Sequence, residues 1–88
     1  MIVERPAVFA QVRDILAHTL RIDPDRVQPA ARLERDLGMD SLRTIETNVA
    51  LEARFGFVAP EVVRPEELGI VTVDDLVSHV CDVIARAS

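Results

Sequence analysis

The run DLGMDSL, residues 36–42, contains the residue types and spacing that could support chemistry. Its serine follows an acid, where a helix is expected to begin. The first turn of a helix presents unpaired amide hydrogens and a positive dipole end, so a phosphate esterified to Ser41 would be stabilised there. Asp40 or Ser41 could instead serve only as the helix N-cap, with Gly38 letting the chain turn. These residues alone leave both roles open for Ser41.

Ser41 has no general base beside it in the sequence. His18 and His79 are the only histidines, and nothing in their spacing places either near Ser41. GMDSL also differs from the G-x-S-x-G nucleophile elbow. One cysteine, Cys81, and two scattered histidines give no metal-ligand spacing. We therefore predict no catalytic residue and no metal site, and interpret Ser41 as an acceptor on which another enzyme acts.

Composition places the chain among small acidic proteins. Its 88 residues suit one domain, residues 1–88, with a limited core. A net charge of −5 and three phenylalanines, without tyrosine or tryptophan, argue against a nucleic-acid partner. The amino terminus lacks an export signal, and no apolar run approaches the roughly 20 residues that cross a bilayer. We expect a discrete cytoplasmic monomer that binds neither nucleic acid nor membrane.

Three longer helices are expected from the periodicity of apolar residues. The first spans residues 6–20 and ends near Arg21, before the proline-containing segment IDPDRVQP. The second spans residues 41–55 and stops at Gly56. The last begins at TVDD, where Thr72 and Asp75 have the spacing of a capping box. The segment PEEL, residues 65–68, predicts one short additional helix.

Residues 21–40 are too many for a structureless connection, since loops longer than about 12 to 15 residues are uncommon in compact domains. Val27, Leu33 and Leu37 are the candidates to anchor this loop, and AARLERDL, residues 30–37, could form a helical turn of its own. No strand pattern is present. The sequence therefore predicts an all-α fold, a small four-helix bundle of three longer helices and one short helix, with a long first loop.

The run from residue 33 to residue 56 resembles the acyl carrier proteins, phosphopantetheine-binding carrier domains. Their pattern is an Asp-Leu-Gly-x-Asp-Ser-Leu turn, followed by a helix that ends in Leu-Glu-x-x-Phe-Gly. The matching positions are Asp36, Leu37, Gly38, Asp40, Ser41, Leu42, Glu46, Leu51, Glu52, Phe55 and Gly56, with Pro60 and the later TVDDL also in place. The order of the expected elements is that of the family as well.

The resemblance implies a specific role for Ser41. Family members carry a 4′-phosphopantetheine arm on this serine, between Asp40 and Leu42 here, and a phosphopantetheinyl transferase supplies the arm from coenzyme A. Acyl groups are held on the arm's thiol as thioesters. The implied partners are that transferase and an acyltransferase, a ketosynthase or other enzymes that act on acyl thioesters.

The helix expected over residues 41–55 carries two apolar stripes, roughly 130° apart at 100° per residue. One consists of Leu42, Ile45 and Val49, and the other of Leu51 and Phe55. Both would be buried if the helix lay centrally among others. The resemblance favours the second stripe facing inward and the first lying open to partner enzymes.

Two charged residues flank that open stripe. Glu46 would border it, and Arg43 would add a positive charge where carriers of the fatty acid type are often acidic or neutral. A positive charge at an exposed position would weaken contacts with the basic patches of such partners by a fraction of a kcal/mol. Arg43 therefore indicates a carrier dedicated to the enzymes of one pathway.

Three polar residues, Thr44, Thr47 and Asn48, lie on the same side of this helix as the inward stripe. The simplest expectation is that a slight rotation of the helix exposes them to solvent. The alternative is a polar interior, which would suit a short or oxygenated acyl chain better than a long saturated one.

The sequence thus predicts a non-catalytic acyl carrier in polyketide or other secondary-metabolite biosynthesis. A carrier for fatty acid synthesis remains an alternative, with Arg43 against it. A peptidyl or aminoacyl carrier usually has two glycines before the serine motif, whereas this chain has Gly38 and then Met39. An unmodified helical interaction domain, in which Ser41 stays bare, is an alternative of another class.

Overall fold

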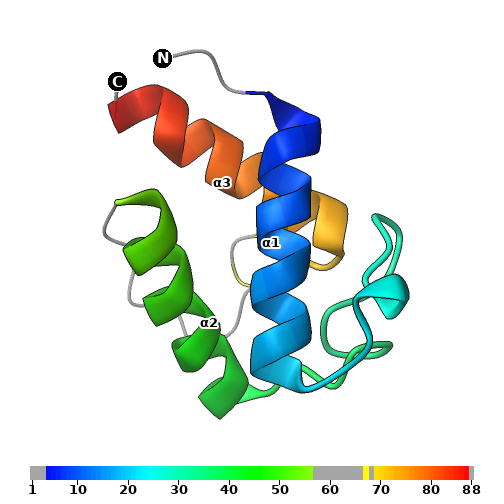
Figure 1. Ribbon diagram of the computed structural model, residues 1–88. Coiled ribbons are helices and arrows are strands. Elements are labelled where there is room, and N and C mark those ends of the chain that lie inside the picture. The colour runs from blue at the N-terminus through cyan, green and yellow to red at the C-terminus, as the bar shows by residue number, and fades with distance from the viewer. Residues whose placement is uncertain (1–3, 57–66, 68, 88) are drawn as a thin grey trace.

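The computed structural model describes residues 4–56, 67 and 69–87. The elements are α1 (Arg5–Leu20), a 3-10 turn η1 (Pro24–Arg26), α2 (Ser41–Phe55) and α3 (Val73–Ala87) (Figure 1). These confirm the three longer helices that the sequence predicts. In the described part of the chain, the pairing of extended backbone is limited to one isolated bridge. The short helix expected after Pro65 falls on residues 65–68, which lie outside the described residues apart from Glu67, so it stays a prediction.

Helix α1 begins and ends where local chemistry requires. Pro6 lies in its first turn, where a missing amide hydrogen costs no helical bond. Arg21 ends the helix in the left-handed conformation, with φ 56°, and its amide donates to the carbonyl of Ala17. The amide of Ile22 donates to the same carbonyl at 3.0 Å. The predicted end of this helix near Arg21 is confirmed.

The core lies where α1 packs against both of the other helices (Figure 1). Helices α2 and α3 approach each other much less closely than either approaches α1. Apolar side chains from all three helices are buried, including Val12, Leu16, Leu51, Val73, Val77 and Val80. Helix α1 is therefore the central element of the fold.

The long connection between α1 and α2 is ordered by its own apolar anchors. Val27, Leu33 and Leu37 are buried, as the sequence predicts. Residues 33–37 form a turn, closed by the bond from the amide of Asp36 to the carbonyl of Arg32 at 2.9 Å. The expected helical turn in AARLERDL is thus present, and this loop is part of the hydrophobic core.

The same loop supplies hydrogen-bond acceptors to the start of α3. The amides of Val73 and Asp74 donate to the carbonyls of Ala31 and Pro29, each at 2.9 Å. In the opposite direction, the amide of Leu33 donates to a carbonyl just before α3 at 2.9 Å. The first amides of a helix have no partner within the helix, so these loop carbonyls complete its hydrogen bonding.

Thr72 and Asp75 form the predicted capping box at the start of α3. The Asp75 carboxylate accepts from the amides of Thr72 and Val71 at 3.0 Å, and the Thr72 hydroxyl accepts from the amide of Asp75 at 3.1 Å. The hydrogen bonds from the backbone amides of Thr72 and Val71 lower the pKa of Asp75 below its ordinary value of 3.8.

This cap predicts an acid-sensitive contribution to stability. Because the pKa of Asp75 is lower in the folded state, its carboxylate stabilises the fold at neutral pH, and this stabilisation is lost as pH falls through the folded pKa. The free energy of unfolding should therefore fall more steeply between about pH 5 and pH 2 in the wild type than in Asp75→Asn. Urea titrations followed by helical circular dichroism measure the two slopes, and equal slopes would contradict the prediction.

Candidate functional site

Ser41 is the first residue of α2, and Asp40 precedes it as the N-cap. The backbone of Asp40 is extended, with φ −129° and ψ −176°, and its carboxylate accepts from the amide of Arg43 at 2.8 Å. Ser41 is exposed, and its hydroxyl makes no hydrogen bond to another residue of the described part. Of the two capping residues that the sequence allows, the structure selects Asp40. The Ser41 hydroxyl therefore faces solvent and does not cap the helix.

The turn before Ser41 is held by a buried methionine. Gly38 has a φ of 76°, a left-handed conformation that other residues rarely adopt. Met39 follows it, is buried, and donates its amide to the carbonyl of Leu33 at 2.9 Å. Sequence reasoning missed Met39. The signal was its place directly before an N-cap, where an apolar residue often packs against the first turns of a helix.

The start of α2 can hold an anion on Ser41. The Asp40 carboxylate accepts a hydrogen bond from the amide of Arg43 at 2.8 Å. The Asp40 carbonyl accepts one from the amide of Thr44, also at 2.8 Å. The amides of Ser41 and Leu42 have no acceptor within the described ranges. These two donors and the positive end of the helix dipole lie beside the Ser41 hydroxyl. A phosphate ester on that oxygen therefore fits the site.

An apolar stripe runs along the exposed side of α2. Leu42, Ile45 and Val49 are 62%, 50% and 61% exposed, and we call them the α2 stripe. On the other side Leu51 is buried, while Phe55 is half-buried against the core. The prediction that one stripe faces inward and the other lies open is confirmed. Exposed apolar residues grouped on one helix face are typical of a protein-binding surface.

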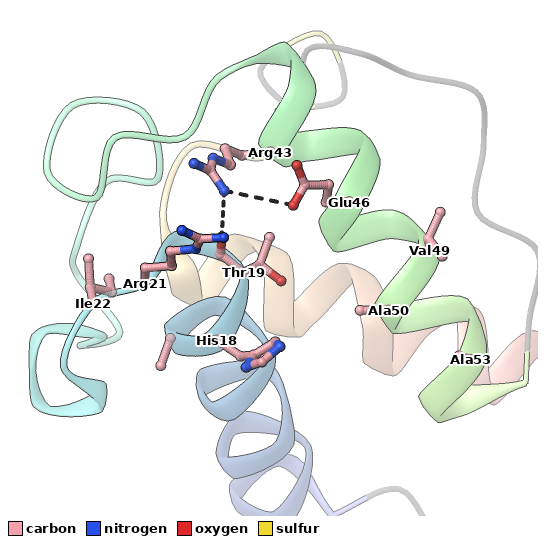
Figure 2. A pocket seen from close by; sticks show the side chains of 10 residues that line it. His18, Thr19, Arg21, Ile22, Arg43, Glu46, Val49, Ala50 and Ala53 are labelled. Carbon is pink, nitrogen blue, oxygen red and sulfur yellow. Dashed lines mark hydrogen bonds and ion pairs between the residues drawn. The ribbon is translucent and has the colours of Figure 1, made fainter.

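A groove of about 640 Å³ lies between the last turn of α1 and one side of α2 (Figure 2). Glu46 and Val49 line it, so it adjoins the α2 stripe. The other lining residues are Ala17, His18, Thr19, Arg21, Ile22, Arg43, Ala50 and Ala53. The open surface of α2 is therefore an apolar stripe with a partly charged groove along one edge.

Arg43 links α2 to α1 and is not a freely exposed charge. Its Nη1 donates to the carbonyl of Thr19 at 3.1 Å and lies 3.8 Å from a carboxylate oxygen of Glu46 (Figure 2). Thr19 lies in the last turn of α1, where carbonyls lack helical partners and the dipole attracts a cation. The expectation that Arg43 is an exposed charge needs correction, since only 33% of its side chain is exposed.

The expectation of solvent exposure is wrong for Thr44 and Thr47, which are 3% and 2% exposed. Asn48 is half-buried. The physical reason is the rotation of α2: Arg43 and Ala50 face α1, which turns the two threonines inward beside Leu51.

The two buried threonines differ in their hydrogen bonding. The Thr44 hydroxyl donates to the carbonyl of Asp40 at 2.8 Å. The Thr47 hydroxyl is fully buried and has no hydrogen-bond partner among the described residues. The interior of the protein thus contains one unsatisfied polar group on α2.

No group of three or more histidine, cysteine, aspartate or glutamate side chains is arranged to hold a metal ion in the described residues. None of the described helices has the length and apolar character needed to cross a membrane.

Two comparisons with known proteins give matches over most of the chain. A family model described as "Phosphopantetheine attachment site" matches residues 10–80, a range that includes Ser41 and all of α2. The chain is also 34% identical over 73 residues to a protein of Campylobacter hominis named "Acyl carrier protein". That alignment covers 83% of this chain and 89% of the relative.

The bond between Arg43 and Thr19 should contribute to stability. Arg43→Met keeps much of the aliphatic packing but removes the donor, so we expect the free energy of unfolding to fall by about 1 kcal/mol. Arg35→Met is the matched control, since Arg35 is exposed in the loop and should cost about 0.5 kcal/mol or less. Urea unfolding measures both, and equal losses would contradict the role given to Arg43.

The two threonines should respond to the same substitution with opposite signs. Thr47→Val removes an unpartnered buried hydroxyl and should raise the free energy of unfolding by about 1 kcal/mol. For a chain of this size, that corresponds to a rise of about 4–8 °C in the unfolding midpoint. Thr44→Val removes a hydroxyl that is hydrogen-bonded and should lower the midpoint. Thermal unfolding of the unmodified protein tests both, and a loss of stability in Thr47→Val would contradict the assignment.

Proposed function

Because the chain belongs to the acyl carrier protein family, whose phosphopantetheine-binding domain carries covalently attached 4′-phosphopantetheine, we propose that Ser41 is the residue that bears this group. The observation that carries the proposal is the position of its hydroxyl. It is exposed at the first residue of α2, released from capping by Asp40, and beside the two open amides of Ser41 and Leu42.

Each residue of the serine turn, residues 38–42, has a part in this role. Gly38 supplies the left-handed turn, and the buried Met39 anchors it to the core, so that Ser41 is presented outward on a fixed support. Asp40 holds the first turn of α2 through its two hydrogen bonds. The amides of Ser41 and Leu42 orient the phosphate of the arm. The bound group supplies a thiol on which acyl groups are held as thioesters.

The partner surface is the α2 stripe, with Arg43 and Glu46 at its edge. The stripe begins at Leu42, directly after Ser41, so an enzyme that acts on the arm contacts it without reaching across the molecule. Members of the family interact with phosphopantetheinyl transferases and with enzymes that use acyl thioesters. We propose that this chain presents its cargo to such enzymes and performs no catalysis itself.

The pathway we propose is polyketide or other secondary-metabolite biosynthesis. Arg43 supports it, because about a third of its side chain remains exposed at the edge of the partner surface and brings a positive charge there. The buried hydroxyls of Thr44 and Thr47 support it as well, because they make the interior less suited to long saturated chains. Fatty acid synthesis is the alternative. Mass analysis of the acyl groups on protein isolated from its native host separates the two pathways.

The attachment residue is tested by intact-mass measurement. After incubation with coenzyme A and a broad-specificity phosphopantetheinyl transferase, the wild type should gain the mass of one phosphopantetheine group. Ser41→Ala should gain none, because it lacks the attacking oxygen. Ser78→Ala is the matched control, since Ser78 lies on α3 and only accepts a hydrogen bond from Arg5, so this variant should be modified fully. Modification of Ser41→Ala, or a wild type that stays bare, would overturn the proposal.

A further inference from the structure

The unpartnered hydroxyl of Thr47 is the least expected feature of the interior. Thr47 is 2% exposed, and its hydroxyl oxygen has no hydrogen-bond partner in the part of the chain that the structure describes. Buried polar side-chain atoms nearly always have a partner, because an unmet donor or acceptor in the core destabilises the fold. The molecule therefore retains on α2 a group that is unfavourable in the unloaded state.

The residues around Thr47 on α2 do not satisfy it. Thr44 and Leu51 share its inward face, one turn before and one turn after. The Thr44 hydroxyl is already committed to the carbonyl of Asp40, and Leu51 is apolar. On the inner face of α2, Thr47 is thus the residue whose hydroxyl neither donates nor accepts a hydrogen bond within the described residues.

Thr47 is also within reach of a group attached at Ser41. It lies six residues further along α2, which corresponds to about 9 Å along the helix axis. An arm anchored at Ser41 and folded back along the helix passes this level. The hydroxyl therefore lies at a level along α2 that a group carried on Ser41 can reach.

The packing between the described helices differs from one pair to the next. Arg43 joins α2 to α1 through Thr19, and Arg5 joins α1 to α3 through Asp74 and Ser78. Helices α2 and α3 approach each other much less closely than either approaches α1 (Figure 1). Within the described residues, moving α2 relative to α3 therefore disturbs less helix packing than moving either of them relative to α1.

From these observations we propose that the Thr47 hydroxyl hydrogen-bonds an oxygen of the carried acyl group. The cargo class is then a short acyl chain with a carbonyl or hydroxyl beyond its thioester. A threonine hydroxyl donates to a carbonyl or accepts from a hydroxyl, so both groups satisfy it. A saturated chain of the same length leaves the hydroxyl buried and unpartnered. This inference rests on the proposed function, in which Ser41 bears the arm.

The test compares loaded proteins that differ by one oxygen. Coenzyme A analogues that carry a hexanoyl or a 3-oxohexanoyl group through an amide, in place of the labile thioester, serve as donors for the phosphopantetheinyl transferase, and intact mass verifies one group per chain. The rise in unfolding midpoint on loading is then measured by circular dichroism. In the wild type, we expect the 3-oxo chain to raise the midpoint by about 4 °C more than the saturated chain. In Thr47→Val, this difference should vanish or reverse.

Two variants act as controls. Thr44→Val should keep the wild-type preference, because its hydroxyl is engaged within α2. Thr47→Ser retains a hydroxyl with little change in shape and should keep the preference too. Equal midpoint shifts for the two chains in the wild type, or an unchanged preference in Thr47→Val, would overturn the inference while leaving the proposed function intact. Failure of the wild type to load in the mass measurement would overturn the proposed function itself.

Discussion

The rotation of α2 about its axis decides which of its faces is exposed, and the contact of the Arg43 guanidinium with the last turn of α1 is part of that orientation. Helix α2 carries apolar residues on two sides, so hydrophobicity alone allows more than one orientation. With Arg43 on the carbonyl of Thr19, the Leu51 side is buried and the α2 stripe lies open. The same rotation places Thr44 and Thr47 in the core. One orientation of α2 thus accounts for both the exposed apolar stripe and the polarity of the interior.

The serine turn is anchored by the loop that precedes it, and this loop is itself part of the hydrophobic core. Met39 and Leu37 are buried just before Ser41, and Gly38 between them supplies the left-handed conformation. Because Asp40 alone caps α2, the serine is left without a structural role. Attachment of a large group there disturbs no hydrogen bond that the fold uses. In the function proposed for Ser41, capping by Asp40 and attachment at the next residue are separate roles, which leaves the anchor exposed and firmly positioned.

Features that arise from local chemistry were predictable from the sequence, and features set by tertiary packing were not. The end of α1 at Arg21, the end of α2 at Gly56 and the capping box of Thr72 with Asp75 all follow from short-range signals. The loop anchors were recognised as apolar residues that needed burial. The inward placement of Thr44 and Thr47 depends on how α2 docks on α1, which no local pattern specifies.

The loop and α3 are joined by hydrogen bonds between segments about forty residues apart in the sequence, such as the bond from the amide of Asp74 to the carbonyl of Pro29. Any fluctuation that lifts the loop away also exposes the first amides of α3 to water. The two segments therefore open and close as one cooperative unit, with shared protection against solvent exchange. These hydrogen bonds also form only when two segments that are distant in the sequence have come together. Closing so long a loop costs conformational entropy, so we expect them to form late in folding.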